Sequence, residues 1–193
     1  MKVLGIDFSL NGTGLSLFDG KQVIFKKVFT SIKKNYQDNP EVFILSPKFK
    51  STGEKLDWVS EQIVKCTDYD FVCMEDHIGR YFEWMDGYGI IKHELRLFNK
   101  PYLMVAPTMV KKYAGNGKAD KDMMSFFLKN DYGFNFDDIG KLSNNIVDAT
   151  WMAILGYQYY KIHIEKDSKI NDTPARLKIL KSLYDKNKIK SED

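Results

Sequence analysis

Cysteine, histidine, arginine and long apolar runs are all scarce in this chain of 193 residues. Cys66 and Cys73 are the only cysteines, and no spacing of Cys and His typical of a metal site surrounds them. We interpret them as core thiols in a reducing compartment, the cytoplasm. No apolar run approaches the roughly 20 residues that a membrane helix needs, and the N-terminus does not have the pattern of a signal peptide. These absences argue against a secreted or membrane-spanning protein.

Arginine occurs only as Arg80, Arg96 and Arg176, although Lys and Arg together number 29. Lysine binds phosphate as a point charge and reads base edges less well than the bidentate arginine fork. The net charge of +3 is small, and its surplus lies in residues 161–193. If the partner is a nucleic acid, this composition favours recognition of backbone and shape over base sequence.

The pattern of apolar residues and turn signals predicts an α/β protein. A loop is expected at 31–50, which contains Pro40 and Pro47 and lacks clear periodicity. Helices are expected at 51–66, 88–98, 108–113, 120–130, 143–160 and 174–187, and strands at 2–8, 14–19, 22–29, 70–75 and 101–106. This order predicts a mixed five-stranded sheet flanked by helices.

Three acidic residues stand out because each lies in an apolar element. Asp7 lies within the first strand, Glu75 ends the fourth, and Asp148 lies inside the helix 143–160, one turn after Asn145. Carboxylates that converge repel one another unless cations lie between them, and an oxygen-only ligand set suits Mg²⁺ or Mn²⁺. Two such ions about 3.5–4 Å apart can promote phosphodiester cleavage. Each acid alone is equally well explained as a turn cap, a loop residue or an ion-pair partner, but the three together are not.

A lysine-rich segment joins the last strand to the helix that carries Asp148. Lys111 and Lys112 end a short apolar turn, whereas Lys118 and Lys121 open the next helix. A lysine at a helix N-terminus opposes the helix dipole, so a role in binding phosphate accounts for these positions better than helix stability does. Taken alone, the segment is better explained as a solvated turn with scattered lysines.

The motifs at 3–14, 71–75, 106–121 and 145–149, in this order, resemble those of the RuvC-type Holliday-junction resolvases, members of the RNase H-like nuclease superfamily. The resemblance covers residues 1–160 and implies an RNase H-like nuclease domain there. It implies a homodimer that resolves four-way junctions or other branched DNA by paired phosphodiester hydrolysis, without a nucleotide cofactor. The size and the lysine-heavy composition are similar to phage versions. Residues 161–193 form a basic helical extension, which is either a solvated surface helix or an added contact to a DNA arm.

The resemblance also assigns roles to individual residues. Asp7, Glu75 and Asp148 fall on three of the four positions that bind divalent metal in this family, and the fourth, normally an aspartate, is Asn145. The implied cofactor is Mg²⁺, with Mn²⁺ as a substitute, as two ions per active site. Lys121 and Lys111 match lysines near the scissile phosphate, where they would stabilise developing negative charge. The predicted DNA-binding residues are Lys111, Lys112, Lys118 and Lys121.

Three other functions remain open at this stage. Asn145 suggests a branched-DNA-binding protein with weak or no catalysis. A nuclease for RNA–DNA hybrids would share the acids, although the lysine segment argues against it. The glycine-rich turn at 11–14 is also found in actin-like and sugar-kinase phosphotransferases, but the chain is short for that fold and has no second turn of this kind. The helix at 88–98 is a candidate dimer interface, and a core helix would have the same pattern.

Overall fold

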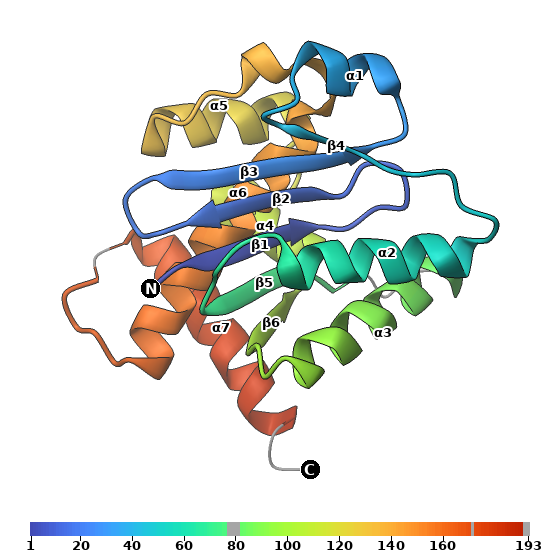
Figure 1. Ribbon diagram of the computed structural model, residues 1–193. Coiled ribbons are helices and arrows are strands. Elements are labelled where there is room, and N and C mark those ends of the chain that lie inside the picture. Colours follow the sequence, from blue (N-terminus) through green and yellow to red (C-terminus); the bar gives the residue numbers. More distant parts are fainter. Residues whose placement is uncertain (77–81, 171, 191–193) are drawn as a thin grey trace.

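A mixed sheet with the strand order β4-β3-β2-β1-β5-β6 forms the centre of the computed structural model, which describes residues 1–76, 82–170 and 172–190 (Figure 1). β1, β2 and β3 pair antiparallel, whereas β5 pairs parallel with β1 and β6, and β4 pairs parallel with β3. The strands are β1 (Val3–Asp7), β2 (Gly14–Phe18), β3 (Val23–Thr30), β4 (Phe43–Leu45), β5 (Phe71–Glu75) and β6 (Tyr102–Val105).

Helices cover both faces of this sheet (Figure 1). α2 (Thr52–Lys65) and α3 (Phe82–Leu97) pack on one face around Leu4 and Ile6. The other face carries α4 (Pro107–Ala114), α5 (Lys121–Tyr132), α6 (Ser143–Tyr159) and α7 (Pro174–Lys190). The remaining elements are α1 (Lys33–Asp38), a 3₁₀ turn η1 (Asp137–Leu142) and a π turn η2 (Tyr160–Ile164). No helix in the described part of the chain is long and apolar enough to cross a membrane.

α6 lies directly against β1 and β2 because glycines on these strands leave room for its backbone. A Cβ added to Gly5 would lie 1.8 Å from the carbonyl oxygen of Ala149, and one added to Gly14 would lie 2.2 Å from that of Asn145. The buried hydroxyl of Thr150 adds a hydrogen bond of 2.8 Å to the hydroxyl of Ser16. The first two turns of α6 are therefore fixed over the ends of β1 and β2.

The predicted mixed sheet flanked by helices is confirmed, with one strand more than expected. Residues 31–50 are not the continuous loop that we expected, since they contain α1 and the edge strand β4. β4 has only three residues and pairs with β3 alone, so it lacks the apolar run that reveals a central strand. The predicted boundary between a nuclease domain at 1–160 and an extension at 161–193 stays a prediction.

Candidate functional site

The register of β1 and β5 places two of the predicted acids on neighbouring strands. Ile6 pairs with Met74, so Asp7 and Glu75 are the next residues along two parallel strands. Alternation along β1 puts Asp7 on the same face as Gly5, the face on which α6 packs. Both carboxylates therefore lie at the carboxyl ends of their strands, on the α6 side of the sheet.

α6 brings the third acid to the same place. Asp148 precedes Ala149, the residue whose carbonyl oxygen lies against Gly5. Burial raises the pKa of Asp7 well above its usual range, and the negative charges of Asp148 and Glu75 raise it further. Burial and Asp148 raise the pKa of Glu75 to about 7. Burial likewise raises the pKa of Asp148. The three side chains thus form one partly buried carboxylate cluster with mutual repulsion.

Two of the four predicted lysines act on this carboxylate cluster. Lys111, in the last turn of α4, lowers the pKa of Glu75 and of Asp148. Lys121, the first residue of α5, lowers the pKa of Asp7 and of Asp148. Acids and lysines therefore meet in space although they lie on five different elements.

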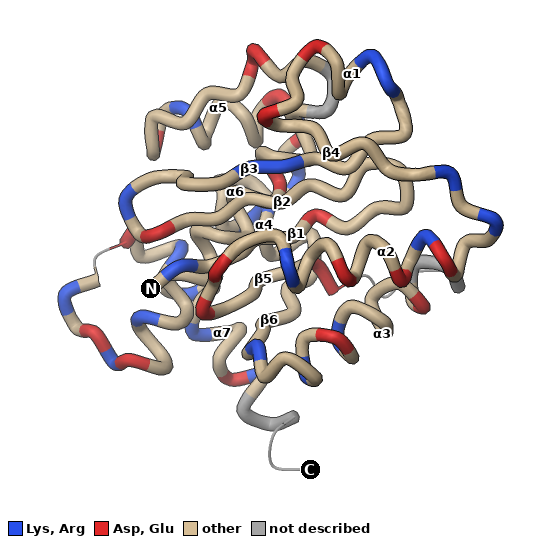
Figure 2. Tube along the Cα trace, viewed as in Figure 1, with Lys and Arg blue, Asp and Glu red and all other residues tan. Residues whose placement is uncertain are grey.

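The other two lysines are exposed, Lys112 in the last turn of α4 and Lys118 on the segment between α4 and α5. The aliphatic part of Lys112 lies against Gly117, where an added Cβ would be 2.9 Å from Cγ of Lys112. The backbone amide of Lys118 donates a 3.0 Å hydrogen bond to Oδ1 of Asn116. On the opposite side of the sheet, acidic and basic positions are interspersed along α2 and α3 (Figure 2). The predicted DNA contacts at Lys112 and Lys118 stay predictions.

Asn145 lies beside the carboxylate cluster and also has a structural partner. Its side-chain amide nitrogen donates a hydrogen bond to the carbonyl oxygen of Gly12, in the turn between β1 and β2. That turn is closed by Thr13, whose hydroxyl donates to the carbonyl oxygen of Ser9 at 2.7 Å. The turn is therefore part of the frame of the site, and only Oδ1 of Asn145 is left to bind a cation.

The donor types in the cluster fit a divalent metal ion. Burial and mutual repulsion disfavour the ionised form of these carboxylates, a divalent cation would favour it, and Mg²⁺ prefers such oxygen ligands. Among residues 1–76, 82–170 and 172–190, however, no group of three or more Asp, Glu, His or Cys side chains is arranged so that it could hold a metal ion. The carboxylates are therefore close enough to raise one another's pKa values, but they are not arranged as a ready-made metal site.

Sequence reasoning missed one residue near the cluster. Tyr88, on α3, is buried, and besides burial the negative charges of Glu75, Asp7 and Asp76 raise its pKa. Its ring meets Phe8 edge to face, with the ring centroids 5.1 Å apart. A tyrosine within an apolar helix pattern gives no signal of this proximity, because it depends on how α3 crosses the strand ends.

Comparison with solved structures addresses the fold. The structure of Thermus thermophilus RuvC matches with a TM-score of 0.60 and 16% sequence identity, over 83% of this chain and 95% of that chain. The chain shares the fold of RuvC. T. thermophilus RuvC in complex with a Holliday junction substrate matches with a TM-score of 0.59 and 14% identity, over 84% of this chain and 96% of that chain. No family model and no curated protein sequence matches the chain.

The likeness to RuvC confirms the α/β fold that the motifs led us to expect. Yeast mitochondrial Holliday junction resolvase Ydc2 matches with a TM-score of 0.45 and 14% identity, over 79% of this chain and 75% of that chain. The identities are low throughout, so the roles of individual residues rest on the geometry of this chain.

Proposed function

We propose that this protein is a metal-dependent endonuclease that cuts branched DNA, with four-way junctions as its main substrate. The observation that carries the proposal is the meeting of Asp7, Glu75 and Asp148 with Lys111 and Lys121 at one end of the sheet. RuvC, which has the same fold, is seen in complex with a Holliday junction. Acids that bind metal beside lysines that bind phosphate are the combination that phosphodiester hydrolysis needs.

In this proposal the carboxylates of the cluster hold Mg²⁺, or Mn²⁺ in its place, and Oδ1 of Asn145 adds a neutral ligand. When bound, two such ions supply Lewis-acid activation of water and stabilisation of the leaving oxygen. Lys121 and Lys111 orient the scissile phosphate and stabilise the negative charge that develops on it. The exposed Lys112, at the end of α4, and Lys118, on the segment that follows it, contact the DNA backbone.

The scarcity of arginine supports a substrate that is recognised by shape. Backbone contacts from lysine position a nucleic acid without reading its bases. Paired cuts in a junction need two active sites, one facing each of two strands. We therefore propose that the protein acts as a homodimer.

A cleavage assay on a labelled four-way junction tests this function. We expect paired nicks with Mg²⁺ or Mn²⁺, none with EDTA, and weaker cleavage of linear duplex, flaps and RNA–DNA hybrids. Asp7→Asn, Glu75→Gln and Asp148→Asn should each abolish cleavage while junction binding in a gel-shift assay survives. Asp57→Asn, at an exposed position on α2, is the matched control and should cut normally. Full cleavage by any of the three cluster variants would refute the site.

The alternative is a protein that binds branched DNA without cutting it. The observation that favours it is the hydrogen bond from Asn145 to Gly12, because the fold uses this side chain in a way that an aspartate would not allow. Junction binding by the wild-type protein without nicks, with either metal, would support this alternative. Preferential cutting of RNA–DNA hybrids in the same panel would instead indicate an RNase H-type nuclease.

A further inference from the structure

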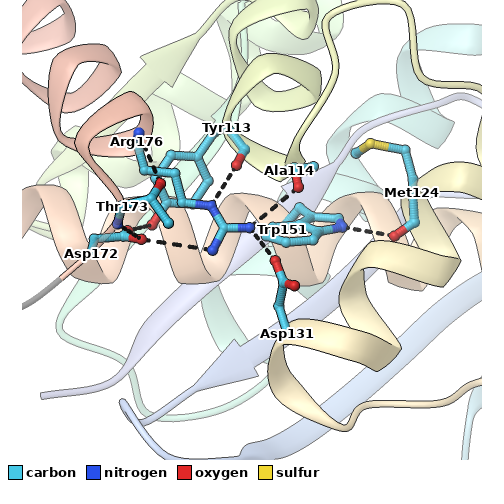
Figure 3. Close-up of polar contacts among 8 residues, drawn as sticks. All are labelled: Tyr113, Ala114, Met124, Asp131, Trp151, Asp172, Thr173 and Arg176. Carbon is cyan, nitrogen blue, oxygen red and sulfur yellow. Dashed lines mark hydrogen bonds and ion pairs between the residues drawn. The ribbon is translucent and has the colours of Figure 1, made fainter.

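Arg176, in the first turn of α7, caps the end of another helix (Figure 3). Its Nε donates a hydrogen bond of 2.7 Å to the carbonyl oxygen of Tyr113, and its Nη2 donates one of 3.2 Å to that of Ala114. These carbonyls end α4, where a helix has no amide of its own to pair with them. A cation at this end also complements the helix dipole. The side chain is only 12% exposed, so these contacts are protected from water.

The same guanidinium reaches two further helices. Nη2 pairs with Oδ2 of Asp131, in the last turn of α5. The guanidinium carbon lies 5.3 Å from the ring centre of Trp151 on α6 and 5.2 Å from that of Tyr113 on α4. Nε1 of Trp151 in turn donates a 3.0 Å hydrogen bond to the carbonyl oxygen of Met124 on α5. One side chain from α7 therefore joins α4, α5 and α6.

The start of α7 is itself held in place. The hydroxyl of Tyr113 donates a 2.7 Å hydrogen bond to Oδ2 of Asp172, and Oδ1 of Asp172 lies 3.7 Å from Nη1 of Arg176. The hydroxyl of Thr173 accepts a hydrogen bond of 3.3 Å from the backbone amide of Arg176, as a helix N-cap does. Arg176 thus projects from a capped helix end that is anchored to α4, so its side chain has a defined direction.

These contacts matter because the joined helices carry the site. α4 carries Lys111, α5 begins at Lys121, and α6 carries Asp148 one turn before Trp151. The segment between α4 and α5 is short and mostly exposed, with Ala119 as its one buried residue. The contacts of α4 and α5 with their neighbours, and not the segment itself, therefore set where the two lysines lie.

We propose that Arg176 is a positioning residue, whose guanidinium locks α4 and α5 onto α6 and so holds Lys111 and Lys121 at the carboxylate cluster. The kinetic part of this proposal rests on the proposed nuclease function. The C-terminal segment is then a component of the site, and its role is distinct from that of an added DNA-binding arm.

The kinetic test compares Arg176→Gln and Arg176→Lys with the wild type on a four-way junction. Arg176→Gln should lower kcat by about 10- to 100-fold with little change in KM, because a displacement of about 1 Å costs that much. Arg176→Lys should recover part of the loss, since an ammonium replaces the charge but not the fork. Lys178→Gln removes the same charge at an exposed position of the same helix and should leave kcat unchanged.

A double-mutant cycle separates positioning from general stability. Because Arg176 acts through both Lys111 and Lys121, the kcat loss from Arg176→Gln should be clearly smaller in a Lys121→Gln background than in the wild type. Losses that simply multiply would overturn the proposal.

A second measurement does not depend on activity. The amides of Gly115 and Asn116 both donate to the carbonyl oxygen of Lys111 at 3.1 Å, and that of Ala119 donates to Asn116 at 2.8 Å. In the full chain, Arg176→Gln and Arg176→Lys should speed hydrogen exchange at these amides and leave β1 and β2 protected as before. Unchanged exchange rates at these amides would overturn the proposal that Arg176 holds α4 and α5 in place. If the wild type does not cut junctions, the proposed function fails. The hydrogen-exchange rates still show whether Arg176 holds α4 and α5 in place.

Discussion

The side-chain amide of Asn145 donates a hydrogen bond to the carbonyl oxygen of Gly12 and so joins the first turn of α6 to the turn between β1 and β2. An ionised carboxylate at this position has no proton to donate. The asparagine therefore suits the fold at the position where the resemblance to resolvases implies an aspartate. Its amide contributes to the frame of the site whether or not its oxygen binds metal.

Replacing Asn145 tests whether its side chain matters more for the hydrogen bond to Gly12 or for binding metal. Asn145→Asp should lower the free energy of unfolding in EDTA by about 1–3 kcal/mol, because a carboxylate then faces the carbonyl oxygen of Gly12. Mg²⁺ should restore part of the loss, since the new charge lies beside the cluster. Urea unfolding with EDTA and with Mg²⁺ measures both effects. Asn144→Asp introduces the same charge one residue earlier and is the control. Equal stability of Asn145→Asp and wild type in EDTA would contradict the prediction.

The carboxylate cluster should make the metal-free protein less stable as the pH rises. Burial and Asp148 raise the pKa of Glu75 from 4.5 to about 7, so between these values the folded state keeps a proton that the unfolded state has released. The free energy of unfolding therefore falls with rising pH across this range, by up to a few kcal/mol. Burial raises the pKa of Asp7 and of Asp148, which adds to the same trend.

Urea unfolding in EDTA across this pH range checks the prediction. Glu75→Gln should flatten the slope, and Mg²⁺ should stabilise the wild type most at the upper end of the range, where the carboxylates are ionised. A slope in Glu75→Gln as steep as in the wild type would show that other groups cause it.

Lys121, the first residue of α5, and Lys118, three residues before it, should have different kinetic roles. Lys121 lowers the pKa of Asp7 and of Asp148, whereas Lys118 is exposed on the preceding segment. Lys121→Gln should lower kcat on a junction by about 100-fold, as the loss of a group that stabilises the transition state does. Lys118→Gln should mainly raise KM and reduce the salt dependence of binding. Steady-state kinetics at two salt concentrations separate the two effects, and equal changes in kcat would contradict them.

Two glycines should respond to alanine in opposite ways. Gly5→Ala places a methyl group where the carbonyl oxygen of Ala149 lies, so we expect a loss of about 3 kcal/mol or more, or failure to fold. Gly89 lies within α3 and has open space where a Cβ would be. Gly89→Ala should therefore stabilise the protein by about 0.5–1 kcal/mol. Thermal unfolding of both variants measures this difference, and a well-folded Gly5→Ala would show that α6 can move away from β1.

The acids could be predicted from the sequence because each lies in an element with a strong apolar pattern. β1, β5 and α6 are buried nearly throughout, and Asp7, Glu75 and Asp148 interrupt or end these patterns. β4 and α1 could not be predicted in the same way. β4 has three residues at the sheet edge, and α1 buries none of its side chains, so neither produces a periodic signal.

The contacts of Arg176 were also beyond sequence reasoning. Asp131 and Trp151 belong to α5 and α6, and only the packing of these helices against α7 brings them to one guanidinium. The lysine surplus of residues 161–193 predicts a charged surface helix. The single arginine of that segment is instead largely buried, where its fork suits several acceptors at once.

The parallel pairing of β1 with β5 has a consequence for the order of folding. A hairpin such as β1–β2 closes over a short loop, whereas β1–β5 pairing and the docking of α6 on β1 close over long stretches of chain. The entropy lost on closing a long loop makes such contacts slow to form. We therefore expect a folding chain to form its first hairpin before its carboxylate cluster. On the proposed function, cutting is restricted to molecules that have finished folding.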